Sequence, residues 1–150
     1  MTKVTCLVLA ILLPLCLGLV GCSKLGEAEL QYRRRQTLLT DEAISKSSEL
    51  QQLNAVCTAV RLPADFAFVS KGGLDDEKIS LAYQYKSDTP FETAKSVFEG
   101  YFKDMTWTET DRSDRYPREL HFTNGSYLVN ITFLEKYSLS NYGIYCEKLR

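Results

Sequence analysis

Two alternating apolar stretches joined by an Asn-Gly pair constrain the fold of this chain most strongly. Leu120 and Phe122 alternate with polar residues before Asn124-Gly125, and apolar residues alternate again after it at Tyr127, Val129, Ile131 and Phe133. An Asn-Gly pair in this setting is the strongest short signal of a β-hairpin, because both central residues of the turn need a positive φ. The sequence therefore predicts two antiparallel strands that meet at residues 124–125.

The same period of two predicts four further strands. They fall near residues 66–70, 79–86, 106–110 and 142–148, where large apolar side chains alternate with polar ones. We expect Trp107, Ile144 and Cys146 to point inward, and Tyr142 and Tyr145 to lie at outward or loop positions. Short connections between strands favour hairpins, and hence an antiparallel sheet.

Two helices are predicted from apolar residues that recur at a spacing near 3.6. The first spans Asp41 to about Val60, with Thr40 as its N-cap. The second begins at Thr89-Pro90, where Thr89 is the expected N-cap and Glu92 completes a capping box. Gly100 lies within the second helix and weakens it by about 1 kcal/mol relative to alanine, which close packing would explain.

The predicted order of elements is α-β-β-α-β-β-β-β. An amphipathic helix must bury its apolar face against the antiparallel sheet, so we expect an α+β fold of two layers with one packed amphipathic helix. A chain of 150 residues is long enough for one such domain. We place this single domain at residues 41–150.

The N-terminus has the pattern of an export signal. One cation, Lys3, precedes fourteen apolar or small residues at positions 7–20, with Pro14 in their middle. This length fits a signal peptide, whereas a membrane-spanning helix needs about 20 such residues. A proline inside the run argues further against a permanent span.

The end of this run, Leu19-Val20-Gly21-Cys22, resembles the lipobox of bacterial lipoproteins. The resemblance implies that the thiol of Cys22 receives a diacylglyceryl group and that residues 1–21 are removed as a signal peptide. Ser23 is similar to the pattern that permits sorting to the outer membrane. We therefore expect a lipid anchor in the outer membrane and a domain that faces the periplasm, with the inner membrane or the cell surface as alternatives.

Two other interpretations of Cys22 stay open. It could be an incidental thiol of an ordinary secretory signal that is cleaved after Ser23, or part of a retained transmembrane anchor. Under the lipobox interpretation we expect residues 22–40 to form a lipidated and partly helical tether. Its cations, Lys24 and Arg33 to Arg35, favour a solvated helix face over contact with anionic lipid.

The cysteine count agrees with the lipobox interpretation. Of five cysteines, Cys6 and Cys16 leave with the signal, Cys22 carries lipid, and Cys57 and Cys146 remain as one pair. In an oxidising periplasm this pair is expected to form a disulfide, worth about 4 kcal/mol in the loop-entropy model. The alternative is two separate buried thiols.

Catalysis, metal binding and nucleic-acid binding have little support in the sequence. Removal of residues 1–21 leaves a formal net charge of −2, whereas a nucleic-acid binder usually has a basic excess. The only histidine, His121, has neither a nucleophile at motif spacing nor three further metal ligands. We therefore expect no enzyme, no metal and no cofactor.

A contact surface is the remaining functional candidate. Arg112, Arg115, Tyr116 and Arg118 lie close together in the loop before one strand, and arginine and tyrosine are enriched in binding patches. Alternation places His121 on the sheet face that points away from the core. We expect this loop and this face to bind a partner protein.

The sequence thus predicts a lipid-anchored envelope protein that works as a non-enzymatic interaction module. An accessory subunit, an inhibitor and an immunity-type protein all fit this description, and the expected partners are membrane lipid, through acylated Cys22, and an envelope protein. The alternative function is a small-ligand carrier or a cell-wall hydrolase in the periplasm.

Overall fold

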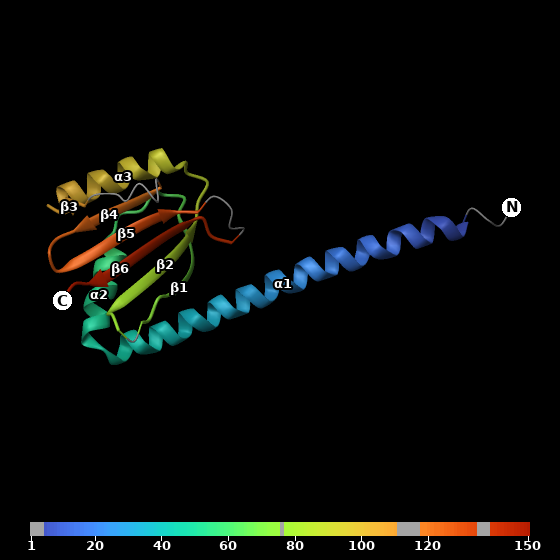
Figure 1. Cartoon of the computed structure of the whole chain (residues 1–150), viewed down its shortest axis with the longest axis horizontal. Helices are drawn as coiled ribbons and strands as arrows, with labels where there is room; N and C mark the ends of the chain where they lie inside the picture. Colours follow the sequence, from blue (N-terminus) through green and yellow to red (C-terminus); the bar gives the residue numbers. More distant parts are fainter. Residues whose placement is uncertain (1–4, 76, 111–117, 135–138) are drawn as a thin grey trace. The chain divides into compact units, whose positions relative to one another are not determined.

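The computed structural model describes residues 5–75, 77–110, 118–134 and 139–150, with side chains from residue 26 onward. Contacts along the chain divide it into two units, Met1–Arg35 and Gln36–Arg150. The first unit contains most of helix α1 (Thr5–Lys46), and the second contains the sheet (Figure 1). Within the described residues, no helix combines the length and the apolar character that a membrane span requires.

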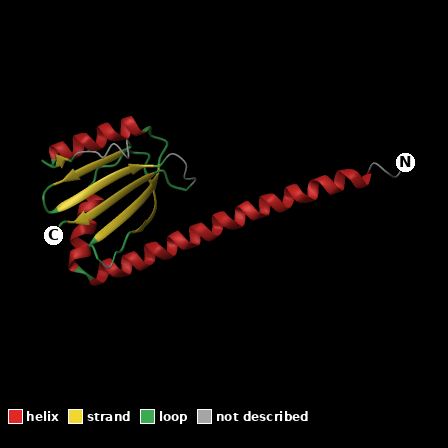
Figure 2. Ribbon diagram, in the orientation of Figure 1, coloured by secondary structure: helices red, strands yellow, loops and turns green. Residues whose placement is uncertain are grey.

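The second unit has an α+β fold with a six-stranded antiparallel sheet (Figure 2). The strands are β1 (Ala67–Gly72), β2 (Ser80–Lys86), β3 (Thr108–Glu109), β4 (Glu119–Thr123), β5 (Tyr127–Phe133) and β6 (Tyr142–Lys148). Their order in the sheet is β1-β2-β6-β5-β4-β3. The predicted fold class, the six strands and their sequence order are confirmed.

The predicted helix of residues 41–60 is wrong, because two helices share this region. α1 continues to Lys46, and α2 (Ser48–Ala59) begins after Ser47, whose extended backbone separates them. The Oγ atom of Ser47 accepts a hydrogen bond from the N–H of Leu50 at 3.3 Å and is the true N-cap. Thr40 lies inside α1 and donates its hydroxyl hydrogen bond to the carbonyl of Gln36.

The predicted capping box at α3 (Phe91–Asp104) is also wrong. The helix begins one residue later than expected, at Phe91, and its N-cap residue Pro90 makes no side-chain capping bond. The hydroxyl of Thr89 instead donates to the carboxylate of Asp65 at 2.6 Å. In a capping box the Thr89 hydroxyl would accept a hydrogen bond from a backbone N–H, whereas here it donates to a charged acceptor that is distant in sequence.

Both α2 and α3 cover one face of the sheet, where one packed helix was expected. Cys146 on β6, bonded to α2, lies directly opposite Val129, and Val129 lies opposite Phe122 on β4. Phe122 stacks on Phe102 of α3 with ring centroids 4.1 Å apart. Directly opposed residues share a face, so both helices pack on this side, which we call the core face.

The core face is lined by buried side chains from the four long inner strands and the two helices. Those from the strands are Leu81, Tyr83, Tyr85, Leu120, Phe122, Val129, Ile131, Tyr142, Ile144 and Cys146. Tyr142 is only 1% exposed, so its expected outward position is wrong. It has the same parity as Ile144, and its hydroxyl reaches the carbonyl of Thr89 at 2.6 Å, which satisfies its polar end.

The end of α3 holds an unusual backbone conformation. Thr106 has a φ of 61°, the N–H of Trp107 donates to the carbonyl of Phe102 at 2.9 Å, and the N–H of Thr106 donates to that of Lys103. This is the Schellman arrangement, in which glycine usually occupies the position of Thr106. The Trp107 ring lies 5.3 Å from that of Phe102, which confirms its inward orientation.

Candidate interaction surface

The strand residues between those of the core face form a second, half-buried surface, which we call the outer face. Its half-buried members on the four inner strands are Ala82, Gln84, Glu119, His121, Thr123, Leu128, Asn130, Thr132, Gly143, Tyr145 and Glu147. These side chains are polar, small or aromatic, with Leu128 as the one large aliphatic member. Strand alternation alone accounts for the difference between the two faces.

His121 lies on the outer face, as the alternation in β4 predicts. Its Nε2 atom is 3.2 Å from a carboxylate oxygen of Glu119, and the other oxygen of Glu119 accepts a hydrogen bond from Thr132 at 3.3 Å. His121 is directly opposite Asn130, which in turn is opposite Tyr145. Histidine, amide and phenol therefore form one row across β4, β5 and β6.

The predicted arginine and tyrosine loop is only partly described. Arg112, Arg115 and Tyr116 lie outside the described residues. Arg118 is described, and its guanidinium carbon lies 5.4 Å from the ring centroid of Phe133. Because Phe133 stacks on Phe91 of α3, Arg118 lies toward the core-face side, whereas His121 lies on the outer face. The structure therefore does not bring Arg118 and His121 together on one face.

The centre of the outer face has features that sequence reasoning missed. Gly143 lies opposite Thr132 on β5 and Gln84 on β2, and a Cβ atom at Gly143 would meet nothing within 4 Å. The space above Gly143 is therefore open. In the adjacent row, the Oδ1 atom of Asn130 is buried and has no hydrogen-bond partner among the residues that the structure describes. Alternation in the sequence could have placed Gly143 and Asn130 on this face. It could not have shown that the Asn130 oxygen lacks a hydrogen-bond donor.

The hydroxyl of Tyr145 also faces outward, which confirms that expectation. It donates to a carboxylate oxygen of Glu147 at 3.0 Å, and burial raises the pKa of Tyr145 above its usual value. The phenol is therefore neutral at physiological pH. It can offer a partner its ring face and one oxygen as acceptor.

The disulfide predicted between Cys57 and Cys146 is present. It joins α2 to β6 with 6.0 Å between the two Cα atoms, and the bonded residues are 89 positions apart in the chain. Both cysteines are buried in the core. The bond thus secures the core face without occupying any part of the outer face.

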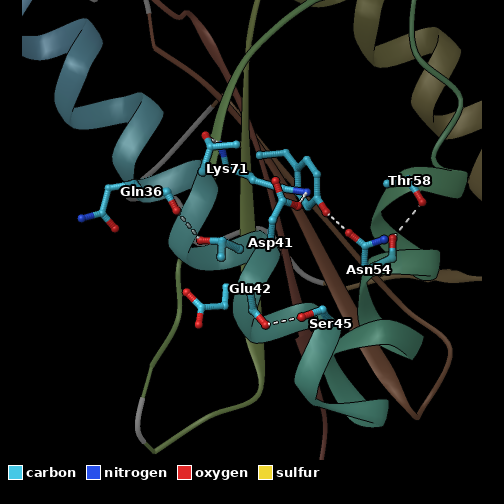
Figure 3. A network of polar contacts seen from close by, with 10 residues as sticks. Gln36, Asp41, Glu42, Ser45, Asn54, Thr58 and Lys71 are labelled. Carbon is cyan, nitrogen blue, oxygen red and sulfur yellow. Dashed lines mark hydrogen bonds and ion pairs between the residues drawn. The ribbon is translucent and has the colours of Figure 1, made fainter.

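A network of polar contacts joins the end of α1 to the edge strand β1 (Figure 3). The backbone N–H of Lys71 donates to the hydroxyl of Thr37 at 3.2 Å, and its ammonium pairs with Asp41. The Lys71 ammonium also lies 5.9 Å from the ring centroid of Tyr83. Thr37 accepts a hydrogen bond from a backbone N–H at the free edge of β1. In this way α1 protects the sheet edge from pairing with another strand.

The same network continues from the sheet to α2. Tyr83 donates its hydroxyl hydrogen bond to the side-chain carbonyl of Asn54. Burial, with smaller contributions from Tyr85 and Asp41, raises the pKa of Tyr83 to about 12. The phenol therefore stays neutral and keeps its proton for Asn54. A structural role explains this network fully.

A cleft of about 610 Å³ lies between the start of α2 and the ends of β2 and β6. Its lysines are paired: Lys78 with Glu147 at 3.3 Å, and Lys148 with Glu49 at 2.6 Å. These hydrogen bonds raise the pKa of both lysines. Because each ammonium already faces a carboxylate, the cleft offers little net charge to a charged ligand.

Comparisons with protein-family models, with curated proteins and with solved structures gave no match. Across residues 26–75, 77–110, 118–134 and 139–150, no group of three or more histidine, cysteine, aspartate or glutamate side chains is placed to hold a metal ion. The functional argument therefore depends on the chain's own residues.

Proposed function

We propose that this chain is a lipid-anchored bacterial envelope protein that binds a partner protein through its outer face. Lipid on Cys22 would hold the molecule at the membrane, most simply at the outer membrane facing the periplasm. The Cys57–Cys146 disulfide supports an oxidising compartment, because such bonds are rare in reducing ones.

The observation that carries the proposal is the composition of the outer face. Its row of His121, Asn130 and Tyr145 combines an aromatic ring with donors and acceptors, on strands whose positions are fixed from behind by the core. Tyrosine contributes a large contact area with little loss of side-chain entropy. The open space above Gly143 leaves room for a partner side chain on this face.

Rigid strands suit this function better than mobile loops. A partner that docks on the outer face pays no ordering cost for the backbone beneath it, because β5 and β6 are paired along seven residues. The side chains of the outer face are half-buried, so they also lose less conformational entropy when a partner binds. A modest contact area can therefore give useful affinity, which two-dimensional confinement by the lipid anchor would raise further.

Site-specific photocrosslinking tests the proposal on the full chain. A photoreactive phenylalanine analogue replaces Tyr145 on the outer face, or Gln52 on the exposed side of α2 as the matched control, in cells that make the protein. We expect a discrete crosslinked product with another envelope protein from position 145 and none from position 52. Equal products from both positions, or none from position 145, would contradict an outer-face contact.

The contribution of the anchor is tested in the same assay. Cys22→Ala removes the proposed lipid attachment and leaves the outer face unchanged. We expect the product from position 145 to fall strongly, because the chain no longer shares a membrane with its partner. An undiminished product would mean that lipid on Cys22 is not required for the contact.

A further inference from the structure

A groove separates α3 from the segment that connects α2 to β1. It encloses about 490 Å³, and its floor is made by half-buried apolar side chains, among them Leu62, Val97 and Tyr101. The groove lies at the exposed flank of α3, away from the outer face. No part of the proposed function accounts for it.

Gly100 opens this groove on the helix side. Glycine weakens the interior of an exposed helix relative to alanine, so its presence in α3 needs a reason. The close packing expected from the sequence is wrong, because a Cβ atom at this position would meet nothing within 4 Å. The chain itself does not exclude a side chain at position 100, whereas a close approach from outside would.

Two opposite charges flank the groove without partners. Arg61 lies on the connecting segment and Asp104 at the end of α3, and both are exposed. Within the described residues neither side chain makes an ion pair or a hydrogen bond, whereas Lys95 and Glu99 of α3 pair with each other at 3.7 Å. The groove thus has an apolar floor between an unpaired cation and an unpaired anion. It is complementary to a second apolar surface that places an anion opposite Arg61 and a cation opposite Asp104.

A second copy of this chain presents that surface. A two-fold axis that passes between Arg61 and Asp104 brings the arginine of each copy onto the aspartate of the other. The same operation places the two α3 helices side by side, and the missing Cβ at Gly100 lets their backbones approach closely. The contact is isologous and closed. It therefore forms a dimer and cannot extend into a larger assembly.

We propose that the groove around Gly100 is a homodimer interface with two reciprocal Arg61–Asp104 ion pairs. Each copy keeps its outer face, because Tyr145 and its neighbours lie on the sheet side opposite to α3. The dimer therefore presents two outer faces. This inference does not depend on the identity of the partner protein.

Charge reversal on the full chain tests the interface. Two copies with different affinity tags are made in the same cells, extracted in mild detergent and purified by one tag. We expect the wild-type copies to copurify. With Arg61→Asp in both copies, an acid at position 61 faces Asp104 in each of the two contacts. With Asp104→Arg in both copies, a base at position 104 faces Arg61 in each contact. Each variant should therefore reduce copurification about tenfold or more.

The decisive sample combines one copy carrying Arg61→Asp with one carrying Asp104→Arg. Every contact then again joins a cation to an anion, so copurification should return, which no folding defect of either variant can produce. Glu92→Lys, a charge reversal on α3 outside the groove, is the matched control and should copurify as the wild type does. Absence of wild-type copurification, insensitivity to the single reversals, or failure of the mixed pair would each overturn the proposal.

Gly100→Ala gives an independent readout. It should raise the thermal unfolding temperature, because alanine is the better helix former, and at the same time reduce copurification, because its Cβ enters the contact. A rise in unfolding temperature with undiminished copurification would show that the copies meet elsewhere.

Discussion

The two faces of the sheet use the same strands and differ in almost every other respect. On β6, Tyr142, Ile144 and Cys146 are at most 1% exposed, whereas Gly143 and Tyr145 between them face outward. The core face therefore sets the stability of the fold, and the outer face is left to vary with function. Pairs of substitutions, one on each face of the sheet, can test whether stability and function are separated in this way.

The largest difference should come from truncating one aromatic residue on each side. Phe102→Ala removes a ring that is 1% exposed and stacked on Phe122, and we expect a loss of about 3 to 5 kcal/mol in the free energy of unfolding. Tyr145→Ala on the outer face should cost less than about 1 kcal/mol. Urea unfolding followed by circular dichroism measures both, and equal losses would remove the distinction between the faces.

Loss of the disulfide should be the next largest effect. Replacing both Cys57 and Cys146 by serine opens a loop of 89 residues, and we expect a loss of about 2 to 5 kcal/mol. Because the bond belongs to the core face, photocrosslinking from position 145 should persist at temperatures where the variant stays folded. Unchanged stability under reducing and oxidising conditions would show that the bond contributes nothing.

Substitution of Asp65, which accepts hydrogen bonds from residues just before α3, should give a smaller and pH-dependent change in stability. Hydrogen bonds from the hydroxyls of Thr89 and Ser87, and from the N–H groups of Asp88 and Thr89, lower the pKa of Asp65 to about 2. Its stabilising contribution is complete above the ordinary value of 3.8 and is lost as the pH falls from there to 2.

Asp65→Asn tests this contribution directly. At pH 7 the variant should unfold at lower temperature than the wild type, and the two curves should converge as the pH falls from 4 toward 2. The sign follows from a folded-state pKa that lies below the unfolded one. A constant difference between the two proteins across this range would mean that the charge of Asp65 is unimportant.

The smallest effect should be a gain at the other end of α3. Thr106→Gly relieves a positive φ that costs a branched residue about 1 kcal/mol or more, so the free energy of unfolding should rise by about 1 kcal/mol. Thr93→Gly, at an ordinary helical position in α3, is the control and should lose about 0.3 kcal/mol. A loss in Thr106→Gly would show that the threonine side chain stabilises the turn.

The sheet could be predicted from the sequence because alternation is a local property. The hairpin at Asn124-Gly125, the six strands and the orientations of Trp107, His121 and Tyr145 all follow from neighbouring residues. Only Gly125 of the pair has a positive φ, whereas the sequence predicted one at both residues. The helix ends could not be predicted in the same way, since Thr40 and Thr89 match the N-cap pattern. Their hydroxyls are taken by Gln36 and Asp65, and the second of these partners is distant in sequence.

Much of the candidate surface also depends on distant partners. The pairing of Lys71 with Asp41, the unpartnered oxygen of Asn130 and the space above Gly143 arise only when strands are placed in register. Gly100 was visible as an anomaly, but its reason was not, because a sequence cannot show that the position of its Cβ is empty. Alternation can assign such residues to a face but cannot identify the atoms that they meet.

The proposed membrane anchor depends on Cys22, and the intact mass of the mature protein purified from envelopes tests it most directly. The account predicts a chain that begins at Cys22 and carries acyl groups on that residue, with Cys57 and Cys146 oxidised. A chain that begins after Ser23 without lipid, or one that retains residues 1–21, would contradict it.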